Sequence, residues 1–283
     1  MSIAGRAKVI AIVNQKGGVG KTTTSVNLAT SIAAIQKRVL LIDFDPQGNA
    51  TTSFGINKAD CAQNVYNALI EGVGIESITK PSGIPFLSVL PSNVDLSAAE
   101  IELDQLEDRE FVLKQHIETI SHLYDYIFID CPPSLGLLTV NALASADSIL
   151  IPVQCEFFSL EGLSNLLKTF HAIKKNFNSK LEIEGVLLTM YDKRYRLTDQ
   201  VEREVRNIMK NYVYNTIIPR NVRLSEAPSY GKPAIMYDLS SSGALAYIEL
   251  AKEFIAKNEG QKSNQDNNIQ NFQQNQNTEK KVA

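Results

Sequence analysis

Tryptophan is absent from this chain of 283 residues, and cysteine and histidine occur only three times each. Cys61, Cys131 and Cys155 lie far apart and form no CxxC pair, so the sequence indicates neither a disulfide framework nor a zinc site. No apolar run approaches the roughly 18 residues that a membrane helix needs. Residues 1–7 lack the apolar segment of a secretion signal. We therefore expect a cytoplasmic protein.

Positive charge is concentrated in one part of the chain, although the net charge is −3. Residues 168–232 contain 13 Lys and Arg against 7 Asp and Glu. Segregation of this kind suggests that one face meets an anionic partner. Solvated helix faces are the alternative, and charge alone does not decide between the two.

Short apolar runs alternate with segments of helical periodicity. The apolar runs at 8–13, 38–43, 126–130, 148–153, 185–190 and 214–218 predict buried strands. Helical spacing predicts helices over 22–35 and about 97–122, 136–145, 160–176, 197–211 and 241–257. The alternation predicts an α/β fold with a doubly wound, mostly parallel sheet that helices cover on both faces.

One domain is expected over residues 1–257, and the composition changes after it. In residues 258–283, 13 of the 26 positions are Asn or Gln. Such a segment cannot bury enough apolar surface to offset the entropy of ordering, so it predicts a disordered tail. An amphipathic membrane helix is the alternative, but the segment lacks the apolar stripe and basic face that such a helix needs.

A glycine-rich loop between the first predicted strand and the first predicted helix is the most specific signal. It reads NQKGGVGKTTT over residues 14–24. Phosphates need converging backbone N–H groups, which glycines present at close range, and the following helix N-terminus adds positive potential. The loop predicts an ATP or ADP site of the P-loop NTPase type, with Mg²⁺ held by Thr22. The candidate nucleotide-binding residues here are Gly17, Gly18, Val19, Gly20, Lys21, Thr22 and Thr23.

The loop departs from the usual G-x-x-x-x-G-K-T spacing. Gln15 stands in place of the first glycine, and an additional lysine, Lys16, precedes the glycine pair. Lys16 is hard to aim at phosphates held in its own loop. We expect it to serve a nucleotide held by a facing subunit, so that ATP links a homodimer. A solvent-facing lysine is the alternative.

Five segments together resemble the ParA/Soj branch of the deviant-Walker-A ATPases, in the MinD/ParA superfamily. They read KGGVGKTTT, LIDFDPQGNAT, DYIFIDCPPSLGLLTVNAL, LLTMYDKR and IPRNVRLSEAPSYGKP, and the resemblance spans about residues 8–254. It implies a Mg-dependent ATPase whose ATP-bound sandwich dimer binds double-stranded DNA without sequence preference. It further implies a ParB-like partner that stimulates hydrolysis and releases the dimer, nucleoid association, and a role in chromosome or plasmid segregation.

Three aspartates follow predicted strands at their carboxyl ends, where ligands of open parallel sheets bind. The resemblance implies that Asp45 orients the attacking water and that Asp43 and Asp130 hold the Mg²⁺ environment. A helix N-cap is the alternative for each. Lys16, Lys21 and Asp45 are thus the candidate catalytic residues.

The resemblance also implies that Pro219, Arg220 and Asn221 frame the adenine and ribose, with an ordinary turn as the alternative. Among the basic residues of 168–232, we expect Arg194 and Arg223 to contact DNA first. The alternative is that these arginines are exposed without a ligand.

Three other functions compete with DNA segregation. A MinD-like membrane ATPase needs the basic amphipathic C-terminal helix that residues 258–283 lack. An iron–sulfur reductase needs paired cysteines that bridge subunits, whereas Cys131 directly follows Asp130. A ParA-like ATPase that positions a protein cargo has no sequence feature that separates it from the first interpretation.

Overall fold

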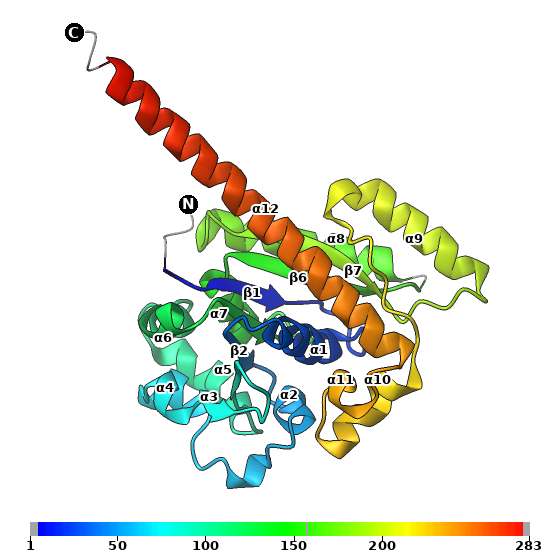
Figure 1. Cartoon of the computed structure of the whole chain (residues 1–283). Helices are drawn as coiled ribbons and strands as arrows, with labels where there is room; N and C mark the ends of the chain where they lie inside the picture. Colours follow the sequence, from blue (N-terminus) through cyan, green and yellow to red (C-terminus); the bar gives the residue numbers. More distant parts are fainter. Residues whose placement is uncertain (1–4, 157, 280–283) are drawn as a thin grey trace.

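The computed structural model describes residues 5–156 and 158–279, with side chains described as far as residue 260. Within these residues the strands form one sheet in the order β3-β4-β2-β5-β1-β6-β7 (Figure 1). All neighbouring pairs are parallel except β3 with β4. The predicted doubly wound, mostly parallel α/β sheet is confirmed. The strands are β1 (Lys8–Ile12), β2 (Val39–Asp43), β3 (Lys80–Pro81), β4 (Leu87–Leu90), β5 (Tyr126–Asp130), β6 (Ser148–Gln154) and β7 (Glu182–Thr189).

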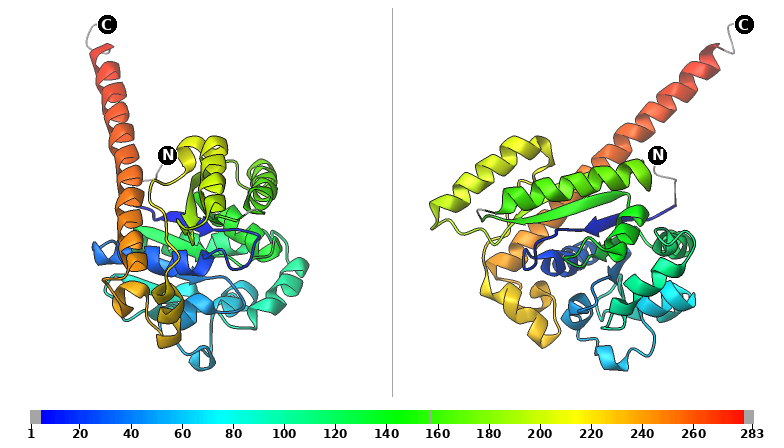
Figure 2. Two further views of the ribbon diagram at one scale, coloured as in Figure 1. Left: turned by 90° about the vertical axis from the view of Figure 1, so that its right-hand side faces the viewer. Right: turned by 180° about the vertical axis from the view of Figure 1, so that it is seen from behind.

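Helices cover both faces of the sheet (Figures 1 and 2). Helices α1 and α12 pack on one face, and α3, α5, α6, α7 and α8 pack on the other. The helices are α1 (Lys21–Ala34), α2 (Asn49–Ser53), α3 (Val65–Glu71), α4 (Ile75–Ile78), α5 (Leu96–Glu102), α6 (Val112–Ile120), α7 (Leu137–Ser145), α8 (Ser159–Asn176), α9 (Arg196–Met209), α10 (Val222–Glu226), α11 (Ala234–Tyr237) and α12 (Ser242–Glu279).

The central strand β5 shows how the sheet divides the apolar core. Alternate side chains of a strand point to opposite faces. Ile127 and Ile129 therefore join the cluster under α6 and α7, whereas Tyr126 and Phe128 join the cluster under α1 and α12. On the second face, both aromatic rings contact Phe254 of α12, with ring centroids 5.4 and 5.8 Å apart.

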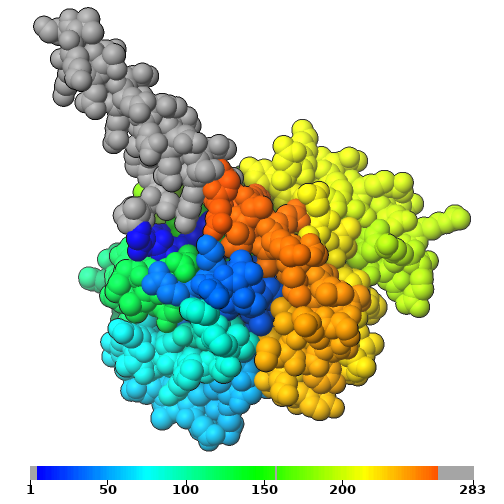
Figure 3. Space-filling view, viewed as in Figure 1, coloured from blue at the N-terminus to red at the C-terminus, as the bar shows by residue number. Residues whose placement is uncertain are grey.

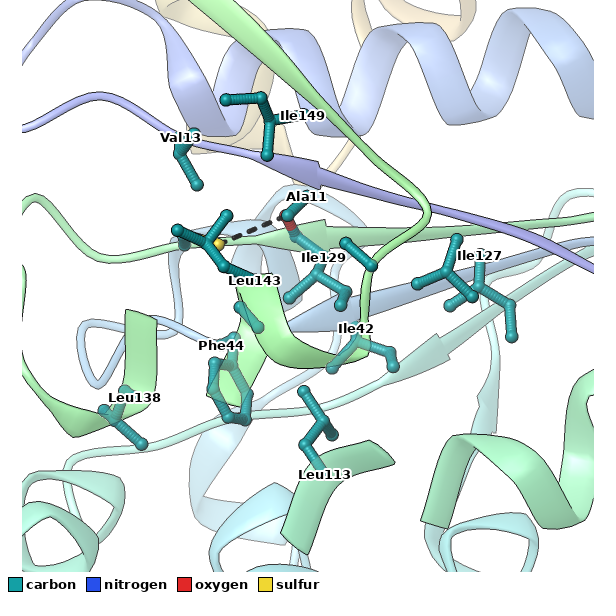
Figure 4. Close-up of a cluster of buried hydrophobic side chains, with 14 of the residues drawn as sticks. Ala11, Val13, Ile42, Phe44, Leu113, Ile127, Ile129, Leu138, Leu143 and Ile149 are labelled. Carbon is teal, nitrogen blue, oxygen red and sulfur yellow. Dashed lines mark hydrogen bonds between the residues drawn. The ribbon is translucent and has the colours of Figure 1, made fainter. Parts of the chain in front are cut away.

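Figure 4 shows part of the first cluster. Side chains from the sheet, including Ile42 and Ile129, lie opposite Leu113 of α6 and Leu143 of α7. All of these are fully buried. Burying a side chain of this size stabilises a fold by about 1.5–3 kcal/mol. This packing fixes the carboxyl end of β5, where Asp130 stands.

The strand predicted at 214–218 is wrong. The Tyr214 and Ile218 amides do donate to carbonyl oxygens of β7, at 3.0 and 2.9 Å. Those of Asn215 and Thr216 instead donate to the carboxylate of Glu253 on α12, at 2.7 and 2.8 Å. A parallel ladder needs alternate amides to reach the neighbouring strand. Because Glu253 accepts from the middle one, no ladder forms over 214–218. Isolated bridges flank the segment instead, from Val213 to Val186 of β7 and from Pro219 to Tyr191.

The single helix predicted at about 97–122 is also wrong. Helix α5 ends at Glu102 and α6 begins at Val112. Between them Asp108 has φ of 53°, a left-handed conformation that a right-handed helix cannot contain. The short strands β3 and β4 were not predicted, because neither is long enough to produce a clear apolar run.

Helix α12 continues to Glu279. Asn258 is buried, and its Nδ2 donates to Glu184 Oε1 at 3.0 Å, so packing against the sheet extends one residue past the predicted domain boundary. The side chains of residues 261–283 lie outside the described part, and disorder of 258–283 stays a prediction. Among the described residues, no helix combines the length and hydrophobicity needed to cross a membrane.

Candidate functional site

The glycine-rich loop joins β1 to α1 at the carboxyl edge of the sheet. Gly18 and Gly20 have φ of 72° and 89°, values that residues other than glycine rarely adopt. Gly20 is the N-cap of α1 and has no side chain to cap it. The first N–H groups of α1 are therefore free of a side-chain cap and can meet an anion.

Two hydrogen bonds hold this loop to the sheet, and a third forms within the loop. Asn14 Nδ2 donates to the carbonyl oxygen of Pro152 at 2.7 Å, and Asn14 Oδ1 accepts from the Lys16 amide at 3.0 Å. Thr189 Oγ1, at the end of β7, donates to the carbonyl oxygen of Val19 at 2.8 Å. The loop is thus preorganised by two strands on the same side of β1.

Lys21 lies almost buried at the start of α1, with a relative exposure of 6%. Its Nζ donates to the carbonyl oxygen of Lys16 at 3.2 Å. Burial lowers the pKa of this ammonium group, and the nearby Asp130 and Asp45 carboxylates partly offset the effect. An anion in the loop would favour the charged lysine further.

Asp130 is fully buried at the end of β5. Its Oδ1 accepts from Ser25 Oγ at 2.8 Å, but Oδ2 has no hydrogen-bond partner of good geometry among the described residues. Burial, followed by the charge of Asp43, raises the pKa of Asp130 to about 7, and the nearby Thr22 hydroxyl reduces this shift. A buried carboxylate oxygen without a partner is costly, so this oxygen is suited to a cation or its bound water.

Asp43 and Asp45 hold the segment that follows β2. Asp43 Oδ2 accepts from both the amide and the hydroxyl of Thr51, at 2.7 and 2.6 Å, which tethers the start of α2. Burial raises the pKa of Asp43 to about 6. Asp45 Oδ1 accepts from the Gln47 amide at 2.9 Å, and its carbonyl oxygen accepts from Ser92 Oγ. Gly48, not Asp43, is the N-cap of α2, so Asp43 is no helix cap here, and its metal role stays a prediction.

A cavity of about 370 Å³ opens beside the start of α1. It brings Thr22 and Thr23 together with Pro219, Arg220 and Asn221, which are almost 200 residues away in the chain. Apolar side chains form much of the remaining wall. Loops and helix ends from distant parts of the chain thus form one pocket next to the phosphate loop, in the position that a nucleoside needs.

Asn221 already bonds to its own chain. Its Oδ1 accepts from the Arg223 amide at 2.9 Å and caps α10, and its Nδ2 donates to Ser242 Oγ at 2.8 Å. Asn221 therefore acts as a helix N-cap in this structure. A role for Asn221 in base recognition stays a prediction.

Lys16 has a partner within its own chain. Its Nζ lies 2.6 Å from Glu156 Oε2, just after β6, and the two side chains are 36% and 47% exposed. Glu156 Oε1 also accepts from Gln154 Nε2. A lysine that was expected to face either a partner subunit or solvent is held by an ion pair.

The two candidate DNA-binding arginines are exposed, and both are paired. Arg194 is 77% exposed and bonds Asp192, whose pKa the guanidinium hydrogen bonds lower to about 2. Arg223 is half-exposed and lies 2.7 Å from Glu226 and 3.3 Å from Asp238. Each arginine therefore has an intramolecular carboxylate partner that competes with a DNA phosphate.

Sequence reasoning missed three residues that shape this site. Glu156 pairs with Lys16, Ser25 bonds Asp130, and Thr189 anchors the phosphate loop. Ser25 extends the run of hydroxyl residues after Lys21, which is a sequence signal. Thr189 ends a predicted strand within LLTM, next to the loop in space but 170 residues away. Only the fold connects Glu156 to Lys16.

Known proteins resemble this chain over most of its length. Residues 7–183 match the model of a family described as an AAA domain. The chain is 57% identical to the sporulation initiation inhibitor protein Soj of Bacillus subtilis, over 88% of this chain and 98% of that protein. It is 49% identical to the chromosome partitioning protein ParA of Myxococcus xanthus, over 88% of each chain.

A solved structure shares the fold as well. Cobyrinic acid a,c-diamide synthase from Mycobacterium smegmatis, with bound ADP and magnesium, superposes with a TM-score of 0.78 at 32% sequence identity. The match covers 90% of this chain and 96% of that chain.

Proposed function

The chain belongs to the ParA/Soj family of chromosome-partitioning ATPases, and from this premise we propose that two copies close on Mg·ATP. The closed dimer binds DNA without sequence preference. It releases the DNA when a ParB-like partner stimulates hydrolysis. The observation that carries the nucleotide site is the buried Oδ2 of Asp130 near Lys21, which has no hydrogen-bond partner among the described residues. Thr22, close to Asp130, also lines the nucleoside-sized cavity that adjoins the glycine-rich loop.

The residues present fit Mg·ATP. Thr22 and Asp130 supply hard oxygen donors, the kind that Mg²⁺ prefers. Asp43 supports this environment from the neighbouring strand. The ion, when bound, neutralises phosphate charge that builds up during phosphoryl transfer. The related synthase structure contains ADP and magnesium, which supports this assignment.

The chain's own groups have distinct tasks in hydrolysis. Lys21 and the amides from Gly17 to Thr23 bind and orient the phosphates. Asp45 positions the attacking water: its Oδ1 is held by the Gln47 amide, while its Oδ2 accepts no hydrogen bond from the described residues. Pro219, Arg220 and Asn221 place the nucleoside in the cavity. Positioning and charge neutralisation are most of what this reaction requires.

Dimer formation requires Lys16 to leave Glu156 and reach the partner's nucleotide. Because the ion pair is partly exposed, breaking it costs little free energy. The phosphate oxygens across the interface offer more negative charge than one carboxylate. ATP therefore acts as part of the interface, and its hydrolysis weakens the dimer.

DNA binding rests on phosphate contacts from Arg194 and Arg223. Because such contacts release counterions, affinity should fall with salt at a log–log slope of about −0.9 per phosphate neutralised. The same reasoning predicts that the ATP-bound dimer associates with the nucleoid.

The test is the ATPase rate with and without nonspecific duplex DNA and a ParB-like partner. We expect low basal turnover and stimulation when both are present. Asp45→Ala should retain ATP and DNA binding but lose turnover, whereas the exposed Asp95→Ala serves as the control. Normal turnover in Asp45→Ala would remove Asp45 from catalysis. If DNA changes neither the ATPase rate nor dimer formation, the result would favour a protein cargo instead.

A further inference from the structure

Helix α9 buries one edge and exposes the opposite one. Thr198, Val201, Val205 and Met209 are buried, and the helix packs on α8. These positions recur at the three- and four-residue spacing of a single helix face. In the space-filling view, the region of α9 (yellow) projects from the body of the molecule (Figure 3). The opposite edge is therefore open to a large partner.

That opposite edge carries only cations and amides. Its residues follow one another at spacings of four, three, four and three. The four that belong to α9 lie within about 40° of one line along the helix, and the fifth is its C-cap residue. All of them are exposed. We call this set the α9 stripe: Arg196, Gln200, Arg203, Asn207 and Lys210.

The three cations of the α9 stripe make no ion pair with any residue that the structure describes. The acids nearby are mostly engaged elsewhere: Asp199 Oδ1 accepts from Tyr191 OH at 2.8 Å, and Glu202 pairs with Arg206 at 2.9 Å. Glu204 flanks the stripe at its margin and is exposed. The three cations of the stripe are thus available to an external anion. Arg194 and Arg223, by contrast, already have carboxylate partners.

The stripe ends at a hollow of about 320 Å³ at the C-terminal end of α9. Arg206, Lys210 and Lys257 line it, together with Tyr212 and Asn215. Glu253 is the acid in its wall, and it is engaged with backbone amides. The positive charge therefore continues past the end of the helix.

We propose that the α9 stripe and this hollow form a surface for the backbone of double-stranded DNA, extending the contact that begins at Arg194. This inference rests on the proposed function, because it names where the DNA lies. From Arg196 to Met209 the helix rises about 20 Å, the axial length of about six base pairs. Arg196 and Arg203 are seven residues apart, about 10 Å along the helix, and Lys210 follows directly after its last residue.

DNA fits this edge better than an acidic protein does. Phosphate oxygens accept from arginine, lysine and amide N–H groups alike, so every residue of the stripe can donate to one strand or the other. Protein interfaces are centred on a buried apolar or aromatic anchor, and the stripe itself contains none. Its alternation of cations and amides therefore matches a polyanion.

The test neutralises the three cations together, as Arg196→Gln, Arg203→Gln and Lys210→Gln, and measures binding of the ATP-analogue-bound dimer to labelled duplex DNA over a salt series. Each DNA phosphate that the variant no longer neutralises should reduce the log–log salt slope by about 1, so we expect a reduction of up to about 3 for each protomer that engages DNA. Arg203→Gln alone should reduce the slope by about 1.

A matched control removes the same charge from α8 and the turn that follows it, as Lys168→Gln, Lys175→Gln and Lys180→Gln. All three lysines lie outside the α9 stripe and the hollow at its end. This control should retain the wild-type slope. Both triple variants should also retain the ATP-dependent dimer in sizing experiments, because neither set lies at the phosphate loop.

The possible outcomes distinguish failure of this inference from failure of the proposed function on which it rests. If the wild-type dimer shows no salt-dependent DNA binding, the proposed function fails. If the wild type binds and Arg223→Ala weakens it, but the stripe variant keeps the wild-type slope, the inference about α9 alone is overturned. If the stripe variant keeps DNA binding and loses stimulation by the partner protein, the stripe binds an acidic protein, which also overturns it.

Discussion

Glu156→Gln should tighten the ATP-dependent dimer, because it releases Lys16 from an ion pair that competes with the partner's nucleotide. In the isolated chain the Lys16 Nζ and Glu156 Oε2 atoms are 2.6 Å apart. Both side chains are more than a third exposed, so solvent screens the pair and it contributes only about 0.2–1 kcal/mol. A dimer must break two such pairs.

The two pairs together cost about 0.4–2 kcal/mol, which corresponds to a factor of about 2 to 30 in the dimerisation constant. Glutamine preserves the size of the side chain and can still accept from Gln154 through its amide oxygen. The expected gain is therefore a change in charge rather than in packing. It should shrink at high salt, where the competing ion pair is already weakened.

Analytical ultracentrifugation with a non-hydrolysable ATP analogue measures this constant. Glu161→Gln, at the exposed start of α8, removes the same charge without touching Lys16 and should leave the constant unchanged. Lys16→Ala should abolish the dimer while retaining most nucleotide binding. A dimer of Glu156→Gln that is equal to or weaker than the wild type would refute the idea that Glu156 restrains Lys16.

Other changes test the interior of the site and the core. In metal-free and nucleotide-free protein, the raised pKa of Asp130, about 7 against an ordinary 3.8, means that its contribution to stability is full below about pH 4 and is lost as the pH rises toward 7. The Tm should therefore fall over that window more steeply than in Asp130→Asn, and parallel curves would contradict this. Thr189→Val leaves a buried loop carbonyl unsatisfied, at a cost of about 1–3 kcal/mol, and should weaken ATP binding about 5- to 150-fold in equilibrium titrations. Thr189→Ser should bind almost as well as the wild type, so equal losses in both would argue against the hydrogen bond. Gly231→Ala places a Cβ 2.6 Å from Gly55 Cα at a φ of +61°, and urea unfolding should show a loss of at least about 2 kcal/mol. An unchanged midpoint would show that the two backbones can separate.

Several elements could be predicted because their signals are local. The runs that became β1, β2, β5, β6 and β7 are continuous and apolar, as strands buried on both faces must be. The edge segment 214–218 is apolar only at Tyr214, Ile217 and Ile218. It failed as a strand because the carboxylate of Glu253, on a helix far along the chain, bonds the amide that the ladder needed.

The candidate site divides in the same way. Phosphate binding depends on consecutive residues, so the loop from Lys16 to Thr23 and the strand-end aspartates were visible before the fold. Roles that depend on which other side chain a residue meets could not be predicted from the sequence. Asp43 has the chemistry of a metal ligand, yet in the fold its Oδ2 tethers Thr51.

The order of residues in the chain by itself determined the phosphate loop, the parallel sheet and the family, since each is written in contiguous residues whose spacing reports backbone conformation and burial. The tertiary structure decided which groups meet. It placed Glu156 against Lys16, left one oxygen of Asp130 without a partner among the described residues, and lined up the cations of α9 on its exposed edge. Electrostatic contacts act over a few ångströms in space, and residues 140 positions apart reach that distance only when the sheet brings their strands together.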